Sequence, residues 1–326
     1  MSPKGIALLS ALATPPLFFA FLMTGSVFVP PNKFFDGNYA VIVWYIRLPT
    51  AIAAALIGSI LSMSGAVMQT LYRNPLLDPY IAGTASGAAF GALLAYALVA
   101  AGLSPVYLIL YQVPLAFFFA TTASITTLAI GRGDVYATVI GGVAVSYLFS
   151  AATTIGLSYL SSLMPQIPPV TFWLFGYIDY VGYRIDVVLA AIVALMTVFA
   201  IREARRMDLV AISDELAHVR RLRPNTYRAL WIAMISLSVS FVVSQVGVIG
   251  FVGLMVPHIV KQMLGHSSAR EVVPSSAAVG APVLLASDIL ARGALGFSVP
   301  VTAITSIFSV PVILLVLKNV GRVSDR

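Results

Sequence analysis

Long stretches without a charged side chain constrain this sequence more than any other feature. No Asp, Glu, Lys or Arg occurs in residues 5–32, 48–72 or 293–317, runs of 28, 25 and 25 residues. About 20 apolar residues are enough for one helix to cross the hydrocarbon core of a bilayer. We therefore predict an all-α integral membrane protein.

The overall composition agrees with this prediction. Charged residues make up 10% of the chain and hydrophobic residues 60%, with a mean hydropathy of +0.97, whereas soluble domains carry about 25% charged residues. These values exclude a soluble globular domain, a disordered chain and a coiled coil. Because the sequence has no cysteine and only three scattered histidines, we expect no disulfide, no catalytic thiol and no metal site.

Charged and helix-breaking residues together predict the helices within the longer stretches. Residues 78–132 are long enough for two helices and divide near 102–105, where glycine and proline interrupt them. Residues 134–179 hold one long helix, then Pro165, Pro168 and Pro169, then a shorter apolar piece around Trp173. The run between Arg228 and Lys261 contains three glycines and predicts two short helices that meet at a re-entrant bend.

Two further spans, over about residues 186–205 and 272–292, bring the count to ten. We predict one transmembrane domain that covers residues 1–326. Its N-terminal apolar stretch resembles a secretory signal. This stretch is longer than a usual signal core and has no clear small-residue cleavage site, so we keep it as the first span.

Basic residues predict how these spans are oriented. With the N-terminus in the cytoplasm, 15 of the 19 Lys and Arg residues lie on the cytoplasmic side, as the positive-inside rule expects. The four left outside are Lys33, Arg47, Arg184 and Arg292. We therefore predict a multi-pass protein of the cell (inner or plasma) membrane with both termini in the cytoplasm. The net charge of +7 reflects this topology and contact with membrane lipid, not binding of nucleic acid.

Small residues recur at helical spacing inside the spans, at Gly58, Ser62 and Gly65 and again at Gly83, Gly87 and Gly91. Such spacing lets helix backbones approach closely. It predicts tight packing of a helix bundle, and it also fits a pathway lined by glycine.

The spans lack the residues that would drive or catalyse a reaction. An ion-coupled secondary transporter usually carries Asp, Glu or His in mid-membrane, and a membrane enzyme would need such residues clustered near one interface. Asp288 and Arg292 lie at the outer end of a span, where their spacing predicts a structural ion pair, and His258 is expected to be packed or hydrogen-bonded. None of the four lysines follows a glycine, as a P-loop requires, so we expect ATP hydrolysis on another polypeptide.

The longest polar stretch, residues 202–228, has seven arginines and four acidic residues. Within it, residues 213–224 predict a short cytoplasmic helix with Ser213 as its N-cap, acidic residues in its first turn, arginines in its last turn and a proline at its end. Leu216, Val219 and Leu222 form an apolar stripe on this helix. The stripe predicts either a helix that lies on lipid headgroups or one that docks into a partner protein.

Seven segments resemble the FecCD family, the permease subunits of binding-protein-dependent ABC importers for iron-siderophores, haem and vitamin B12. They read IRLP (46–49), SGAVMQ (64–69), RNPLLDP (73–79), GTASGA (83–88), GVIGFVGLMVPH (247–258), ASDILAR (286–292) and VPV (299–301). They follow the family's order over nearly the whole chain after the first span, so the combination is specific although each piece is short.

The resemblance implies the type II ABC importer permease fold, with about ten transmembrane helices and a homodimer whose translocation path follows the dimer axis. Two ATPase subunits carrying ATP and Mg²⁺ would bind on the cytoplasmic side, and one extracytoplasmic substrate-binding protein on the other. This chain itself would bind no cofactor. The substrate stays open among haem, ferric siderophores, corrinoids and oxyanions.

The resemblance also assigns the cytoplasmic loop of about residues 206–228 to ATPase coupling. The coupling residues would be Ser213, Asp214, Glu215, Leu216, Ala217, His218, Val219, Arg220 and Leu222. The family often has glycine near the end of this helix, where this chain has Arg220 and Arg221.

On the outer side, the resemblance implies that Arg47 and Arg292 dock the binding protein. They match positions at which vitamin B12 permeases of the family meet acidic residues. Those relatives have a second arginine where this chain has Thr50. Arg47 also suits a simpler role as an anchor at the membrane interface.

The cytoplasmic gate implied by the resemblance has two parts. Asn74 and Leu76 match one part, and Val135 and Tyr136 match the other, where relatives have small hydroxyl residues. The apolar piece at 171–177 would correspond to an outer half-helix that lines the cavity.

Overall fold

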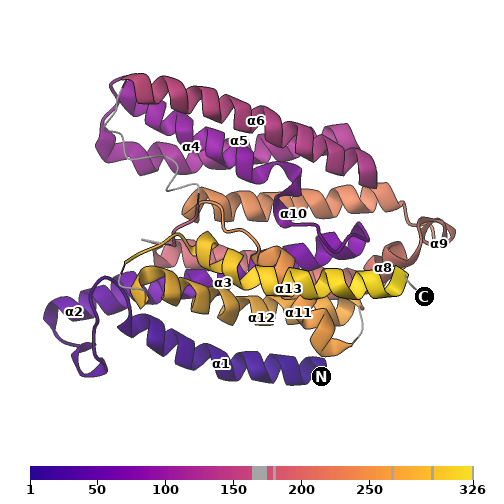
Figure 1. Cartoon of the computed structure of the whole chain (residues 1–326), viewed down its shortest axis with the longest axis horizontal. Coiled ribbons are helices and arrows are strands. Elements are labelled where there is room, and N and C mark those ends of the chain that lie inside the picture. The colour runs from indigo at the N-terminus through magenta and orange to yellow at the C-terminus, as the bar shows by residue number, and fades with distance from the viewer. Residues whose placement is uncertain (164–174, 179–180, 266–267, 295–296, 325–326) are drawn as a thin grey trace. The chain divides into compact units, whose positions relative to one another are not determined.

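A computed structural model describes residues 1–163, 175–178, 181–265, 268–294 and 297–324 of the chain. Every regular element among these residues is a helix, and none of them belongs to a strand. Figure 1 shows the helices in chain order, coloured from indigo to yellow. The predicted all-α fold is confirmed.

The helices divide between two compact units. The first unit consists of Met1–Asp78, Ile178–Asp208 and Gly250–Arg326. It holds α1 (Pro3–Met23), η1 (Pro31–Lys33), α2 (Gly37–Val41), η2 (Ile42–Arg47), α3 (Leu48–Leu71), most of α8 (Tyr183–Ile212), α11 (Val252–Leu264), α12 (Ala269–Ile289), η5 (Leu290–Ala294) and α13 (Val301–Ser324).

The second unit consists of Pro79–Tyr177 and Leu209–Ile249. It holds η3 (Pro79–Ala82), α4 (Thr84–Ala100), η4 (Pro105–Tyr107), α5 (Leu108–Gly131), α6 (Val135–Leu163), α9 (Asp214–Val219) and α10 (Pro224–Val246).

Ten of these helices are apolar, as the charge pattern predicts. Seven helical segments are long and apolar enough to cross a membrane, namely α1, the continuous helix Gly37–Leu71, α5, α6, α8, α10 and α12 with the start of η5. Three shorter apolar helical segments, α4, α11 and Val301–Leu314 of α13, complete the set. The chain is therefore a multi-pass membrane protein.

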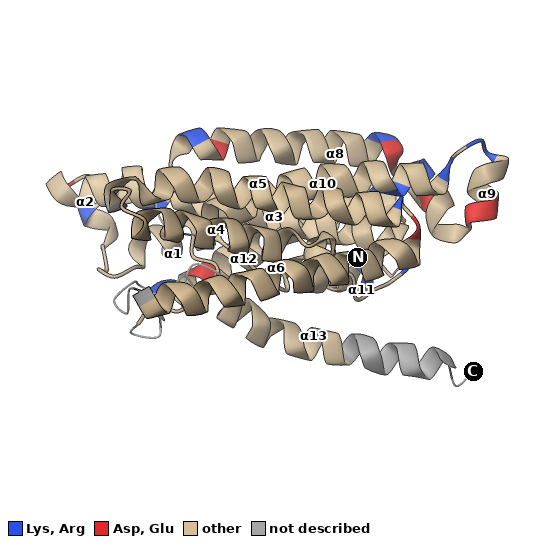
Figure 2. Cartoon of the chain, turned by 90° about the horizontal axis from the view of Figure 1, so that it is seen from above, with Lys and Arg blue, Asp and Glu red and all other residues tan. Residues whose placement is uncertain are grey.

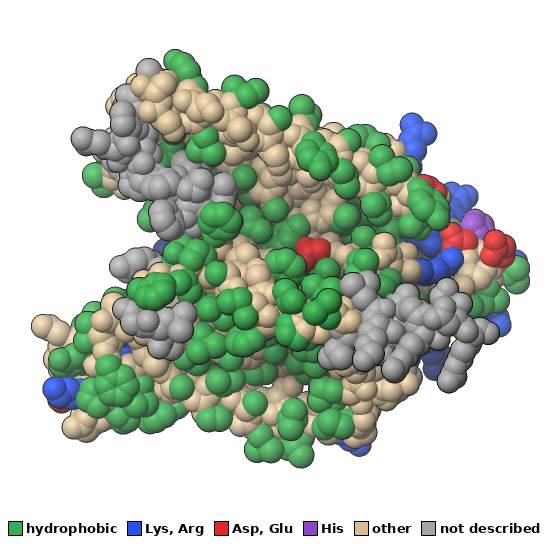
Figure 3. Space-filling view, in the orientation of Figure 1, with side chains coloured by type: hydrophobic (Ala, Val, Ile, Leu, Met, Phe, Trp, Pro, Cys, Tyr) green, Lys and Arg blue, Asp and Glu red, His purple; other side chains and the backbone are tan. Residues whose placement is uncertain are grey.

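The side chains agree with this assignment. Charged residues gather near helix ends, while the middles of the helices are almost free of them (Figure 2). Hydrophobic side chains are exposed over much of the surface (Figure 3). Among them, Ile140 and Ile155 on α6 are 67% and 72% exposed. In a membrane protein such surfaces face lipid or another subunit rather than water.

Two predicted helix boundaries are wrong. The second span begins at Gly37, not near Arg47, because residues 37–47 continue as helical turns into α3 and place Arg47 inside the helix. The helix before the glycine-rich bend is not short. It begins at Pro224, because proline fits the first turn of a helix where the missing N–H is not needed.

In the first unit, α3 is the central helix. Twenty of its 24 residues are buried, and it packs against α12 and α11. A Cβ added at Gly58 would lie 2.2 Å from the carbonyl oxygen of Gly280 on α12, and one added at Gly65 would lie 1.7 Å from that of Gly253 on α11. The predicted close approach of helix backbones at these glycines is confirmed.

In the second unit, α4 packs along α5 and α6, and α10 packs along α5. Gly87 and Gly91 of α4 face the carbonyl oxygens of Phe119 and Leu115 on α5, where added Cβ atoms would lie only 2.4 and 2.3 Å from those oxygens. The same small-residue packing therefore operates in both units.

The predicted outer half-helix at 171–177 lies mostly outside the described residues, as do Pro165, Pro168, Pro169 and Trp173. Within the described part, the backbone N–H of Tyr177 donates a hydrogen bond of 2.9 Å to the carbonyl of Val246.

Candidate functional site

The short helix α9 begins where its local sequence predicts. The Ser213 hydroxyl accepts a hydrogen bond of 3.2 Å from the backbone N–H of Leu216, which satisfies one of the free amides of the first turn. Asp214 and Glu215 follow in that turn, where the helix dipole favours negative charge. The predicted N-cap is therefore present.

The predicted end of this helix is wrong. The helix stops at Val219, because Arg221 takes a left-handed backbone conformation with φ of 58°. The N–H of Arg221 donates to the carbonyl of His218 at 2.8 Å, and the N–H of Leu222 donates to that of Ala217 at 2.9 Å. This is a Schellman ending, and glycine usually occupies the left-handed position. Arg221 thus keeps the turn that glycine often provides in the family.

The left-handed turn gives a local prediction. Arg221→Gly relieves a backbone strain of about 1 kcal/mol or more, so amide hydrogen exchange across residues 214–222 should slow. Arg220→Gly is the matched control, because Arg220 has φ of −85° and glycine there adds only backbone entropy to the unfolded chain. Exchange should accelerate in the control, and faster exchange in Arg221→Gly would contradict the assigned turn.

The helix α9 has one buried and one exposed side. The side chain of Ala217 is fully buried, whereas Leu216 and Val219 are 37% and 79% exposed. Leu222, the third member of the predicted stripe, is half-buried. The exposed apolar surface of α9 is therefore the pair Leu216 and Val219, which lie one turn apart.

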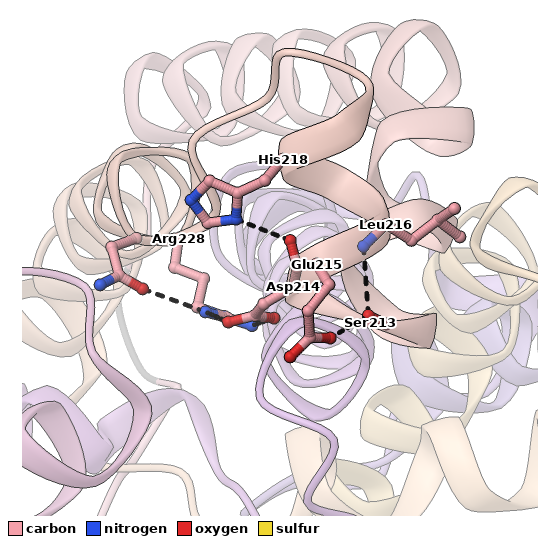
Figure 4. Close-up of polar contacts among 7 residues, drawn as sticks. Ser213, Asp214, Glu215, Leu216, His218 and Arg228 are labelled. Atoms are coloured by element: carbon pink, nitrogen blue, oxygen red, sulfur yellow. Dashed lines mark hydrogen bonds and ion pairs between the residues drawn. The ribbon is translucent and has the colours of Figure 1, made fainter.

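An ion pair with a buried arginine holds α9 against α10. The guanidinium of Arg228 donates two hydrogen bonds to the Asp214 carboxylate, at 2.6 and 3.0 Å (Figure 4). The side chain of Arg228 is 1% exposed and that of Asp214 is 37% exposed. Because loss of the Asp214 carboxylate would leave a buried guanidinium without this charge partner, the pairing favours this position of α9. His218 adds a contact of 2.7 Å between its Nδ1 and the backbone carbonyl of Asp214.

The predicted docking arginines both find partners within their own unit. Arg47 is 5% exposed and donates to the carbonyls of Leu22, at 2.8 Å, and Val27. Arg292 forms the predicted ion pair with Asp288 at 2.8 Å and donates to the carbonyl of Ile178.

These contacts give both arginines a structural role. The guanidinium of Arg292 also lies over the ring of Phe21, 4.6 Å from its centroid. Arg47 and Arg292 therefore join α1, the helix Gly37–Leu71 and the end of α12 on one side of the first unit.

Two of the predicted gate residues follow α3, and the other two begin α6. Asn74 and Leu76 follow α3 in the first unit, where the Asn74 carboxamide accepts a hydrogen bond of 2.9 Å from the N–H of Leu76. Val135 and Tyr136 are the first two residues of α6 in the second unit, and Tyr136 is 79% exposed.

Two side chains hold the connection that carries Asn74 and Leu76. His258 contacts the carbonyl of Pro75 through its Nε2 at 2.7 Å, so the predicted hydrogen bond of this histidine is confirmed. Gln69 of α3 donates to the carbonyl of Leu77 at 3.4 Å and to that of Leu254 on α11 at 3.2 Å. The connection is therefore tied to α11.

Sequence reasoning missed the partner of Asp214. The sequence patterns used Arg228 only to orient the spans in the membrane. Its charge near the start of an apolar helix was the signal that could have indicated an ion pair. Sequence reasoning also missed Asp186, which is 5% exposed and has no hydrogen-bond partner for its carboxylate among the described residues.

Comparison with known proteins supports one family. The FecCD transport family matches residues 11–319. A probable iron chelatin transport system permease protein of Helicobacter pylori is 32% identical, over 84% of this chain and 82% of its own length. A cobalamin import system permease protein of Halobacterium salinarum is 35% identical, over 86% of this chain and 74% of its own length. A vitamin B12 import system permease protein of Escherichia coli O157:H7 is 30% identical, over 92% of this chain and 91% of its own length.

A solved structure has the same fold. It is described as an inward-facing conformation of a metal-chelate type ABC transporter, and it superposes with a TM-score of 0.82 over 97% of this chain and 99% of that chain, at 24% identity. The ten apolar helices, the order of the sequence motifs and these matches agree with one another. The chain belongs to the FecCD transport family.

Proposed function

We propose that this chain is the permease subunit of a binding-protein-dependent ABC importer that carries a metal chelate or a corrinoid across the membrane. The observation that carries the proposal is the family match over residues 11–319. The relatives named for iron chelatin and cobalamin support the substrate class of iron-siderophore, haem or vitamin B12.

The functional assembly contains this chain twice, together with two ATPase subunits and one extracytoplasmic binding protein. ATP and Mg²⁺ bind to the ATPase subunits, because no lysine of this chain follows a glycine as a P-loop requires. Closure of the ATPase pair on ATP drives alternating access of the membrane helices. Both termini of this chain lie in the cytoplasm, which agrees with the distribution of basic residues.

The ATPase docks on α9. Supporting observations are the exposed pair Leu216 and Val219 and the ion pair between Asp214 and the buried Arg228, which holds the helix in place. An apolar anchor on a rigid, otherwise polar helix is the feature that a protein partner recognises in a groove.

The binding protein docks on the opposite side of the membrane, near Arg47 and Arg292. Because both guanidiniums are engaged within the chain, their main contribution there is to shape the docking surface. The cytoplasmic gate comprises Asn74 and Leu76, and Val135 and Tyr136. The exposed side chain of Tyr136 is the larger obstacle in the second pair.

An ion-coupled secondary transporter is the second candidate function. The observation that favours it is the buried carboxylate of Asp186, since buried carboxylates in membrane helices often carry protons or cations. Asp186 lies in the first turn of α8 rather than in mid-membrane, which favours the importer.

The deciding experiment is a pull-down of the tagged chain from its native membrane in mild detergent, with companions identified by mass spectrometry. We expect a P-loop ATPase and an extracytoplasmic binding protein to co-purify. The recovered binding protein is then screened with cyanocobalamin, haem and ferric siderophores. A stable homo-oligomer without an ATPase in several detergents would favour the secondary transporter and contradict the importer.

A further inference from the structure

The turn between α5 and α6 touches the start of α10 through backbone atoms. Gly133, in this turn, has φ of +81°, and a Cβ added there would lie 1.8 Å from the carbonyl oxygen of Asn225. Real Cβ atoms do not approach another atom so closely. The contact therefore requires glycine at position 133, and it fixes the turn directly against the first helical turn of α10.

Asn225 also reaches the ion pair that holds α9. Its side-chain oxygen accepts a hydrogen bond of 3.2 Å from the same guanidinium nitrogen of Arg228 that binds Asp214. The backbone of Asn225 thus contacts the α5–α6 turn, while its side chain contacts the pair that positions α9. Charge-assisted, two-point bonds of this kind are stiff and directional.

The turn itself is rigid up to the predicted gate. The Asp134 carboxylate accepts a hydrogen bond of 2.9 Å from the N–H of Ala137, and the Asp134 N–H donates to the carbonyl of Gly131 at 2.9 Å. Val135 and Tyr136 lie within this capped first turn of α6. A displacement of the turn therefore moves both gate residues with it.

We propose that Asp214, Arg228, Asn225 and Gly133 form a mechanical connection that makes Val135 and Tyr136 follow α9. The four are positioning residues, and all belong to the second unit. The proposal rests on the proposed function of α9 as the ATPase-docking helix. It adds the route by which ATPase closure moves one part of the cytoplasmic gate, through packed backbone and the ion pair between Asp214 and the buried Arg228.

The chain has no cysteine, so a single introduced thiol can report on the gate. We would introduce Ala137→Cys, isolate the permease–ATPase complex, and compare its rate of labelling by a maleimide without nucleotide and with ATP plus vanadate. The labelling rate should differ between the two states. Gly133→Ala and Asp214→Asn should each reduce that difference roughly threefold or more, while the ATPase still co-purifies.

Matched variants separate the connection from general damage. Gly265→Ala imposes the same backbone strain at φ of +75°, but no described atom lies within 4 Å of an added Cβ, so the labelling difference should persist. Glu203→Gln removes the ion pair between Glu203 and Arg206, whose side chains are 16% and 62% exposed, and should also preserve the labelling difference. Asp214→Glu keeps the charge and should restore most of the response lost in Asp214→Asn.

The outcomes that overturn the proposal are distinct. If Gly133→Ala and Asp214→Asn both keep the full nucleotide-dependent difference in labelling rate while the ATPase stays bound, the gate does not use this connection. Loss of the ATPase from the Asp214→Asn complex would assign the pair to docking instead of transmission. Absence of any ATPase from the parent complex would contradict the proposed function itself, before any labelling is measured.

Discussion

Replacing the exposed residues of α9 should detach or uncouple the ATPase while the permease still folds. The variant combines Glu215→Gln, Leu216→Ser and Val219→Ser, whose side chains are all exposed. Burial of a leucine and a valine at an interface contributes about 3 kcal/mol in total, so the ATPase should bind on the order of 100-fold more weakly. Ala217, Asp214 and Arg228 stay in place, so α9 keeps its position.

The measurement is the amount of ATPase that co-purifies with the chain, together with substrate-stimulated ATP hydrolysis after reconstitution. The control is Val27→Ser with Phe28→Ser, because these side chains are 50% and 61% exposed and are predicted to lie on the external side. The control should retain the ATPase. Unchanged ATPase recovery and stimulated hydrolysis in the α9 variant would mean that the ATPase docks elsewhere.

Gly65→Ala should abolish folding of the first unit. The added Cβ would lie 1.7 Å from the carbonyl oxygen of Gly253 and 2.9 Å from its Cα, so α3 and α11 must separate. Both residues are buried, and backbone atoms have no other rotamer to adopt. We expect a loss of at least about 3 kcal/mol of stability and almost no monodisperse protein after detergent extraction.

The matched control for this variant is Gly5→Ala in α1. The nearest atom to a Cβ at Gly5 is the Ser2 hydroxyl oxygen at 3.4 Å, an ordinary distance, and alanine has the higher helix propensity. Gly5→Ala should therefore give wild-type yield in size-exclusion chromatography. A normal yield of Gly65→Ala would refute the close packing of α3 on α11.

The helices could be predicted from the sequence because each depends on a local property. Charge-free runs of 25 to 28 residues have few alternatives to membrane helices, since backbone polar groups in lipid must be satisfied within the segment. The start of α9 was equally predictable, because Ser213 binds an amide only three residues away. Helix ends were less predictable, as Arg221 shows by adopting a conformation usually given to glycine.

The partners of individual side chains were not predictable. Asp214 and Arg228 form an ion pair, but no regular spacing in the sequence predicts that these two residues meet. Arg47 was expected to face outward, and only the packing of α1 beside it shows that its guanidinium is used for the carbonyls of Leu22 and Val27.

The sequence by itself therefore determined the class of the protein, its ten apolar helices, the start of α9 and the family resemblance. These follow from hydropathy, charge and short-range hydrogen bonds, which act over a few residues. Only the tertiary structure decided which glycines face another backbone, which arginines are buried, and that Gly133 contacts Asn225 while Asp214 and Asn225 both bind Arg228. Such contacts join residues far apart in the chain, and they depend on how whole helices pack against one another.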